Sequence, residues 1–258
     1  MDLQLTDQRF LVCGASSGFG KAVAESLLQE GARCILVARR IEMLRASFSD
    51  YEEQVEFVMG DLTSPKTVGR VVEKVRKGPF HGALINAGGP PVGTPTETSM
   101  EDWDEAYQLV MRWKIDLMLK LVPILKENRY GRLLCIESKS VKQPVPALVL
   151  SNAFRAGVVG FVKTLAGEVA GDGITVNVLA PGAHETPAIE RLIKKKSEQN
   201  QITIAAARIA TEKSIPVGRM GRAEEIASLA AWLLSTHSSY VTGQTISHDG
   251  GSISGLFG

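Results

Sequence analysis

Short runs of β-branched and aliphatic residues alternate along the whole chain with longer runs of helical periodicity. Strands are predicted at residues 9–13, 34–38, 55–59, 83–85, 132–136, 174–179 and 245–247. Strands that alternate with helices are joined by crossover connections, and such connections build a parallel sheet. No linker, repeat or low-complexity stretch interrupts the pattern. The sequence therefore predicts one α/β domain that spans residues 1–258.

Helices are predicted after Gly18 and over about 103–126, 152–170 and 223–234. The segment from Pro187 to Lys213 is also helical in pattern, but it is polar. Its apolar residues Ile202, Ile204 and Ile209 are interpreted as helix core, with the lining of a substrate pocket as the alternative.

Charge and composition exclude several functional classes. Lys and Arg number 29 against 28 Asp and Glu, so the basic excess typical of nucleic-acid and membrane-surface proteins is missing. No apolar run reaches the ~18 residues of a membrane span, and no leader pattern opens the chain, which favours a cytoplasmic protein. Three cysteines within apolar strands indicate buried thiols, and four scattered histidines argue against metal catalysis.

A glycine turn, Gly14-x-x-x-Gly18-x-Gly20, comes directly after the first strand and opens a helix. Glycine lets the backbone approach a pyrophosphate closely, and the helix N-terminus supplies N–H donors and a positive dipole. The turn therefore predicts a dinucleotide site. Arg39 and Arg40 end the second strand, where an acid would accept from a free ribose 2′-OH and an arginine would pair with a 2′-phosphate. We expect NADP(H) to be preferred over NAD(H), unless these arginines are only solvated loop charges.

Several further motifs follow in order along the chain. Gly60-Asp61-Leu62-Thr63 follows the third strand, Asn86-Ala87-Gly88 the fourth, and Val176-Asn177-Val178-Leu179-Ala180-Pro181-Gly182 includes the sixth. Together with the glycine turn and Asp249-Gly250-Gly251, they closely resemble the short-chain dehydrogenase/reductase family, and among its members 3-oxoacyl-carrier-protein reductases and glucose dehydrogenases. The resemblance implies a doubly wound Rossmann-type domain with a central, mostly parallel seven-stranded sheet flanked by helices. It also implies a homodimer or homotetramer.

The same resemblance assigns a cofactor site and a substrate segment. The implied cofactor-binding residues, with those predicted from the turn, are Gly14, Ser16, Ser17, Gly18, Phe19, Gly20, Arg39, Arg40, Asp61, Leu62, Asn86, Ala87, Gly88, Arg155, Pro181, Gly182 and Thr186. A small-molecule carbonyl or alcohol is the implied substrate, and the segment at about 186–213 would contact it.

The catalytic pattern of the family is broken in this chain. Members use a tyrosine that passes the proton, a lysine four residues later, a preceding serine, and an asparagine on the long helix. Ser138 matches the serine, but Ser151 occupies the tyrosine position, Arg155 the lysine position and Val110 the asparagine position. A serine hydroxyl is a far weaker acid than a phenol, and an arginine does not titrate as a lysine does.

Other groups near the cleft can supply a proton. Lys139 and Lys142 follow Ser138, and a buried lysine can act as an acid near pH 7, although both can equally be surface lysines. His184 lies between Gly182 and Thr186, where the substrate would approach, so it is a third candidate for the proton donor. The alternative is that it belongs to a solvated polar loop.

Three functions remain open on the sequence. The first is an NADP(H)-dependent oxidoreductase of altered mechanism, in which Ser138 acts with a lysine, a histidine or water as the proton source. Its candidate catalytic residues are Ser138, Ser151, Arg155, Lys139 and Lys142. The second is an NADP(H)-binding pseudoenzyme or sensor without turnover. The third, a purely structural subunit without nucleotide affinity, disagrees with the retained Asp61 and Asn86-Ala87-Gly88.

Overall fold

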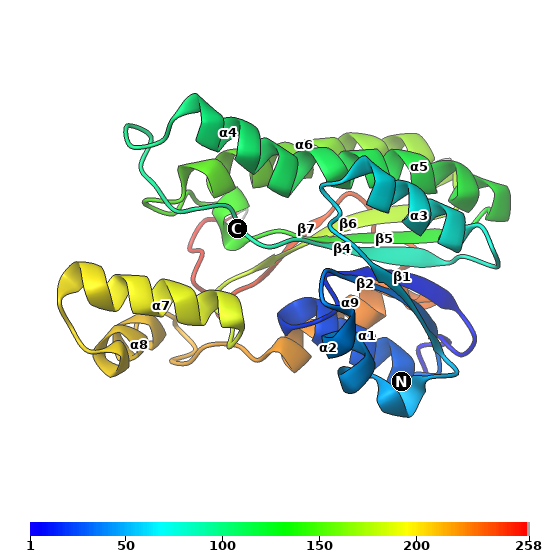
Figure 1. Ribbon diagram of the computed structural model, residues 1–258, viewed down its shortest axis with the longest axis horizontal. Coiled ribbons are helices and arrows are strands. Elements are labelled where there is room, and N and C mark those ends of the chain that lie inside the picture. Colours follow the sequence, from blue (N-terminus) through cyan, green and yellow to red (C-terminus); the bar gives the residue numbers. More distant parts are fainter. Residues whose placement is uncertain (257–258) are drawn as a thin grey trace.

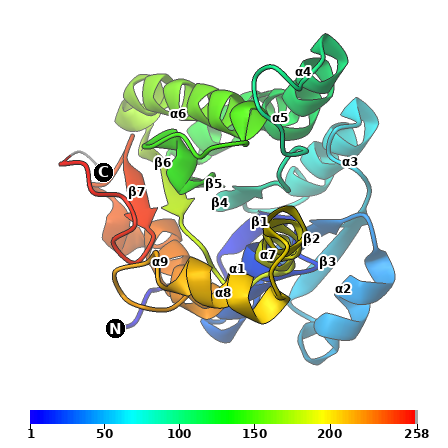
Figure 2. The same ribbon diagram turned by 90° about the vertical axis from the view of Figure 1, so that its left-hand side faces the viewer.

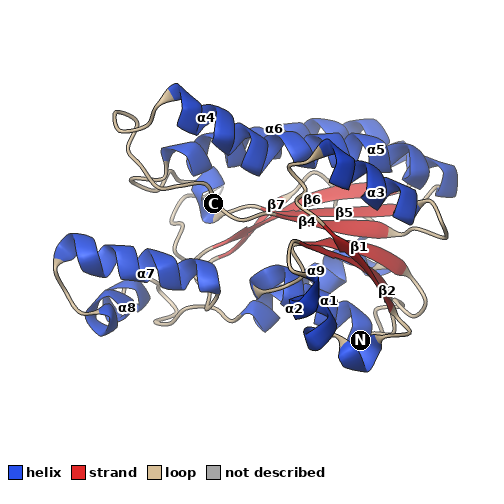
Figure 3. Cartoon of the chain, viewed as in Figure 1, coloured by secondary structure: helices blue, strands red, loops and turns tan. Residues whose placement is uncertain are grey.

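A seven-stranded sheet forms the centre of the computed structural model, which describes residues 1–256 (Figures 1 and 3). The strand order is β3-β2-β1-β4-β5-β6-β7, and every neighbouring pair is parallel. The strands are β1 (Arg9–Cys13), β2 (Arg33–Ala38), β3 (Val55–Met59), β4 (Gly82–Asn86), β5 (Gly131–Ile136), β6 (Ile174–Pro181) and β7 (Thr245–His248). The predicted α/β class and the doubly wound, Rossmann-type architecture are confirmed, and the sheet is parallel throughout.

Helices cover both faces of the sheet because alternate strand residues point to opposite sides. In β1, Phe10 and Val12 face one apolar core, and Leu11 and Cys13 face the other. Figure 1 shows the two helical layers. The first layer holds α1 (Gly18–Gln29), α2 (Ile41–Ser47) and α9 (Ala223–Leu234), and the second holds α3 (Pro65–Val75), α4 (Met100–Tyr107), α5 (Trp113–Asn128) and α6 (Val149–Val169).

The long helix predicted over about 103–126 is interrupted in the structure. A π-helical turn, Gln108–Arg112, separates α4 from α5. The Trp113 indole N–H donates to the Leu109 carbonyl at 2.8 Å, which satisfies a carbonyl of the irregular turn. Val110, at the centre of the turn, is fully buried. Single π turns of this kind are frequent at functional sites.

The segment after β6 forms two helices, α7 (Pro187–Asn200) and α8 (Ile204–Glu212), which extend to one side of the sheet (Figures 1 and 2). Their small apolar cluster is made by Ile193 and Ala207 together with Ile215 and Met220. The expectation of a helix core at Ile202, Ile204 and Ile209 is wrong. Their side chains are exposed because Ile193 and Ala207 occupy the inward face.

The three cysteines are buried free thiols, as predicted. Burial raises the pKa of Cys13 to about 12, so this thiol is un-ionised and unreactive near neutral pH. Among residues 1–256, no helix combines the length and the apolar character that crossing a bilayer would require.

Candidate active site

The predicted site residues lie at or beyond the carboxyl ends of strands β1 to β6. Strands β2 and β3 lie on one side of β1, whereas β4 to β7 lie on the other, so the winding direction reverses between β1 and β4. Ligands of open parallel sheets bind in the crevice at such a reversal. The structure therefore brings the predicted residues to the edge of the sheet where a ligand is expected.

The turn after β1 is shaped by its glycines. Gly14 has φ +68° and Gly18 φ +56°, which side-chain-bearing residues rarely adopt. A Cβ atom on Gly20 would lie 2.3 Å from the Gly14 carbonyl oxygen. The N-cap of α1, Ser17, makes no side-chain hydrogen bond to the helix, and the first turn carries no acid. The N-terminus of α1 is thus suited to bind a phosphate.

The loop after β6 lies over this turn. A Cβ atom on Gly18 would contact the Thr186 methyl carbon at 3.6 Å. The Phe19 ring meets the His184 imidazole edge-on, with 5.2 Å between their centroids. The glycine turn and the loop after β6 are more than 160 positions apart in the sequence, but they lie together in the structure. Both segments contain residues predicted to bind the cofactor.

The edge of the site at β2 and β3 carries exposed charges. Arg39 and Arg40 are both exposed. The Asp61 carboxylate accepts from the Thr63 N–H at 2.9 Å and the Thr63 hydroxyl at 2.8 Å. Burial would raise the pKa of Asp61, but these hydrogen bonds and the positive charge of Arg39 outweigh it and lower the pKa. The corner predicted to hold the adenosine ribose thus presents positive charge beside one ionised, oriented carboxylate.

Asn86-Ala87-Gly88 closes the opposite side of the glycine turn. The Asn86 side-chain nitrogen lies 3.1 Å from the position of a Cβ on Gly14. A Cβ on Gly88 would meet nothing within 4 Å, so open space adjoins this backbone. A tight glycine turn, an uncapped helix terminus and open space beside Gly88 fit an extended dinucleotide.

Ser138 and Ser151 are partly buried and buried, respectively. Ser138 follows β5 and starts a short 3-10 helix, Lys139–Val141, where its Oγ accepts from the Ser140 N–H at 3.1 Å. Ser151 lies in the first turn of α6. Its Oγ accepts from Nε of Arg155, one helical turn later, at 3.0 Å. The residues at the tyrosine and lysine positions are therefore joined by a hydrogen bond.

Arg155 is held almost entirely by the protein and is only 6% exposed. Its Nη1 donates to the Glu137 carboxylate at 2.9 Å and to the Glu137 carbonyl at 3.1 Å. Its Nη2 donates to the Gly88 carbonyl at 3.4 Å. The guanidinium thus connects α6 to the ends of β4 and β5, and its predicted contact with the cofactor stays a prediction.

Sequence reasoning missed the two residues that complete this arrangement. The other carboxylate oxygen of Glu137 accepts from Lys114 Nζ at 2.5 Å, and both side chains are 0% exposed. Burial lowers the pKa of Lys114, although the Glu137 carboxylate opposes that shift. A signal was present, because Lys114 shares helical spacing with the core residues Leu117, Met118 and Leu121.

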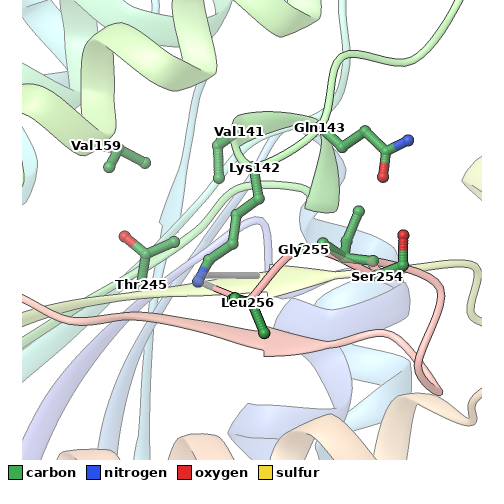
Figure 4. Close-up of a pocket in the computed structure, with 9 residues that line it drawn as sticks. Val141, Lys142, Gln143, Val159, Thr245, Ser254, Gly255 and Leu256 are labelled. Carbon is green, nitrogen blue, oxygen red and sulfur yellow. The ribbon is translucent and has the colours of Figure 1, made fainter.

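The two candidate lysines after Ser138 have different surroundings. Lys139 is partly buried, and among residues 1–256 its ammonium has no hydrogen-bond or ion-pair partner. Lys142 lines an open cavity of about 630 Å³ beside Thr245 of β7 and the segment 253–256 (Figure 4). Neither Ser138 nor Ser151 lines that cavity. Of the two, Lys139 directly follows Ser138 in the chain, whereas Lys142 belongs to this separate cavity.

Two histidines that are distant in sequence form a hydrogen-bonded pair. Nδ1 of His184 donates to the Gly182 carbonyl at 3.1 Å, so in the neutral ring Nε2 accepts from Nδ1 of His248 at 2.9 Å. Burial is the main cause that lowers the pKa of His184. His184 is therefore a neutral, fully engaged ring near pH 7, which disfavours it as an acid.

The remaining tyrosines near these elements do not replace the missing phenol. Tyr107 packs on Phe154 of α6, with 6.0 Å between the ring centroids. Tyr130 precedes β5 and packs against His81 and Arg132, at the amino ends of the strands. Tyr130 therefore lies at the opposite end of β5 from Ser138.

Comparison with known proteins agrees with this geometry. The family model described as enoyl-(acyl carrier protein) reductase matches residues 14–252. The chain is 30% identical to the 3-oxoacyl-[acyl-carrier-protein] reductase FabG of Rickettsia bellii over 96% of this chain and 98% of that one. L-sorbose reductase from Gluconobacter frateurii, solved with NADPH and L-sorbose, superposes with a TM-score of 0.93 and 30% identity over 99% of this chain and all of that one.

A second solved structure is equally similar. YwfH, described as an NADPH-dependent reductase involved in bacilysin biosynthesis, superposes with a TM-score of 0.92 and 27% identity over 97% of this chain and all of that one. The residues matched by the family model, 14–252, include the glycine turn and the motifs after β3, β4 and β6. The chain therefore belongs to the short-chain dehydrogenase/reductase family, whose members are oxidoreductases that use a nicotinamide cofactor.

Proposed function

We propose that the protein is an NADP(H)-dependent oxidoreductase that interconverts a carbonyl and an alcohol, with a proton donor other than the family tyrosine. The observation that carries this proposal is the 3.0 Å hydrogen bond from Arg155 Nε to Ser151 Oγ. The residues at the two substituted positions are therefore buried, polar and hydrogen-bonded to each other, and apolar side chains do not fill the site there.

The two serines are suited to bind the substrate oxygen. Each Oγ already accepts a hydrogen bond, Ser151 from Arg155 and Ser138 from the Ser140 N–H, so each hydroxyl proton is free to donate outward. NADPH, when bound at the glycine turn, would supply the hydride to the carbonyl carbon and would thereby be oxidised to NADP⁺. The serine hydroxyls would stabilise the negative charge that develops on the carbonyl oxygen, with Arg155 polarising Ser151.

A separate group must deliver the proton, because the guanidinium does not titrate and the serine has no base to resupply it. Lys139 is the candidate, since it follows Ser138 directly and has no partner among the described side chains. In this proposal its ammonium gives one proton to the substrate oxygen and takes one back from solvent. Hydride and proton together complete the alcohol.

We also propose that residues 1–258 act as one nucleotide-binding domain in which α7 and α8 contact the substrate. The exposed Leu192, Ile202, Ile204 and Ile209 would then become covered when a small-molecule substrate binds.

Transfer of deuterium tests the enzymatic proposal. The protein is incubated with NADPH deuterated at the nicotinamide C4 and with a panel of ketones and 3-oxoacyl thioesters, and products are read by mass. We expect labelled alcohol from the wild type and a rate lower by about 10²–10³-fold for Ser151→Ala. Ser140→Ala is the matched control, because this neighbouring buried hydroxyl has no hydrogen-bond partner among residues 1–256. Equal rates for Ser151→Ala and wild type would contradict the role of Ser151.

A second candidate is an NADP(H)-binding protein without turnover. It is supported by the near-complete engagement of Arg155 with protein groups and by the absence of a phenol near Ser138 among the described residues. Tight NADPH binding without label in any product would favour it.

Reversing the charge of Arg39 tests the cofactor preference. We expect Arg39→Asp to weaken NADPH binding by about 10–100-fold, the size of a lost charge-assisted hydrogen bond, and to affect NADH far less. Fluorescence titration of both cofactors measures this. Arg45→Asp, on the exposed side of α2, makes the same change in charge and is expected to have little effect on either. An equal loss for both cofactors in Arg39→Asp would overturn the assignment.

A further inference from the structure

Three buried charged side chains lie behind the catalytic positions. We call Lys114, Glu137 and Arg155 the buried charge cluster. The side chains of Lys114 and Glu137 are 0% exposed, and that of Arg155 is 7% exposed. They come from α5, from the end of β5 and from α6. Buried charges are costly unless each is paired, so an arrangement of this kind persists only with every partner in place.

Each oxygen of the Glu137 carboxylate serves a different cation. Oε1 accepts from Lys114 Nζ at 2.5 Å and Oε2 from Arg155 Nη1 at 2.9 Å. Because Lys114 occupies Oε1, the carboxylate cannot turn both oxygens toward the guanidinium. A two-oxygen pairing is the geometry that an unrestrained Arg–carboxylate pair favours.

The guanidinium is planar, so its contacts are geometrically linked. Glu137 holds Nη1 and the Gly88 carbonyl holds Nη2, and these two anchors set the plane and direction of the group. The direction of Nε, which donates to Ser151 Oγ, follows from them. The backbone of Glu137 is also held in place, because its N–H donates to the Leu179 carbonyl at 2.8 Å.

We propose that Glu137 is a positioning residue of the active site and that Lys114 sets the orientation of its carboxylate. Through Arg155, the pair directs the Ser151 hydroxyl toward the substrate oxygen. This inference rests on the proposed function for its kinetic consequence, but the positioning itself is a property of the protein alone.

A second cluster in the same chain provides a matched control. Glu56 accepts from Arg9 Nη2 at 2.8 Å through one oxygen and from Lys74 Nζ at 2.7 Å through the other. It contains the same three residue types as the buried charge cluster, but the side chains of Glu56 and Lys74 are partly exposed. Arg9 begins β1 and Glu56 lies near the start of β3, at the end of the sheet opposite the site.

The experiment compares Lys114→Met and the double variant Lys114→Met/Glu137→Gln with Lys74→Met. Lys114→Met keeps one carboxylate with one guanidinium, so the buried charges stay matched and the variant is expected to fold. The double variant leaves the Arg155 guanidinium with an amide acceptor only, so it is expected to be less stable, and its fold is first checked by circular dichroism. Glu137→Gln alone would leave two buried cations without an anion and is avoided for that reason.

Two readouts separate positioning from simple structural support. The first is solvent exchange of the Arg155 Nε–H, followed by ¹⁵N NMR without cofactor and assigned by its loss in Arg155→Lys. We expect exchange at least about tenfold faster in both site variants, because a displaced guanidinium loses Ser151. The second is the rate of deuterium transfer, expected to fall about 10–100-fold with the NADPH dissociation constant and thermal midpoint of Lys114→Met nearly unchanged.

Wild-type exchange and transfer rates in both site variants would overturn the inference, as would equal effects from Lys74→Met. A loss of thermal stability alone, with Nε–H protection retained, would also overturn it. If the wild type transfers no deuterium, the proposed function fails, and the exchange measurement still decides whether Glu137 and Lys114 position Arg155.

Discussion

Replacing Arg155 with methionine is expected to reduce deuterium transfer by about 10²–10³-fold while the protein remains folded. The variant removes the donors to Ser151 Oγ and to the Gly88 carbonyl, but the buried Lys114–Glu137 pair keeps both of its charges matched. Single-turnover transfer measures the loss, and circular dichroism checks the fold. Arg155→Lys is expected to give an intermediate rate, because one ammonium cannot reach all the partners of a planar guanidinium.

The rate of the double variant Ser151→Ala/Arg155→Met tests whether Arg155 acts through Ser151. If Arg155 acts through Ser151, the two residues form one unit, and their losses should not add. Ser151→Ala/Arg155→Met should then be about as slow as Ser151→Ala. A further loss of the full Arg155→Met factor would mean that Arg155 acts on substrate or cofactor independently of Ser151.

Gly20→Ala is expected to abolish NADPH binding at micromolar protein and to destabilise the fold by about 1–3 kcal/mol or more. The added Cβ would lie 2.3 Å from the Gly14 carbonyl oxygen and 3.0 Å from the Cys13 carbonyl oxygen, so backbone must move. That movement would displace the turn that presents the N-terminus of α1. Calorimetric titration and thermal unfolding together measure the effect.

Two further glycine variants separate folding from binding. Gly69→Ala, in α3 with nothing within 4 Å, is expected to be neutral or to stabilise the helix by up to about 1 kcal/mol. Gly88→Ala also meets no protein atom within 4 Å, so the fold should be unchanged. Its methyl group would nevertheless occupy the space assigned to the cofactor and weaken binding. Unchanged affinity in Gly88→Ala would mean that the cofactor does not pass this backbone.

Much of the fold was accessible because its signals are local. The apolar runs of β1 and β3 agree with the structure at both ends, and the helix Ala223–Leu234 does so as well. Strand ends and glycine turns also carry the predicted cofactor site, so its residues could be proposed before their geometry was known. The prediction that Ile202, Ile204 and Ile209 form helix core was wrong, because periodicity identifies an apolar face of a helix but does not show whether another element packs on that face.

The catalytic centre was harder to predict because its partners are distant in sequence. Motif spacing placed Ser151 and Arg155 four residues apart at the start of the predicted helix 152–170, and the structure begins this helix at Val149, so that both lie on one helical face. Nothing local connects Lys114 to Glu137, and nothing local connects His184 to His248. The π-helical turn around Val110 was also hidden inside what reads as one continuous helix.

Sequence alone determined the α/β class, and it predicted the crevice residues and the four substituted or retained catalytic positions, since these depend on local pattern and order along the chain. Tertiary structure decided what the substitutions mean. Whether Arg155 lies open to a ligand or is bound by Glu137, Gly88 and Ser151 depends on where β4, β5 and α6 converge. The cost of burying charge then requires that Lys114 and Glu137 meet there, and only the packed fold brings them within 2.5 Å.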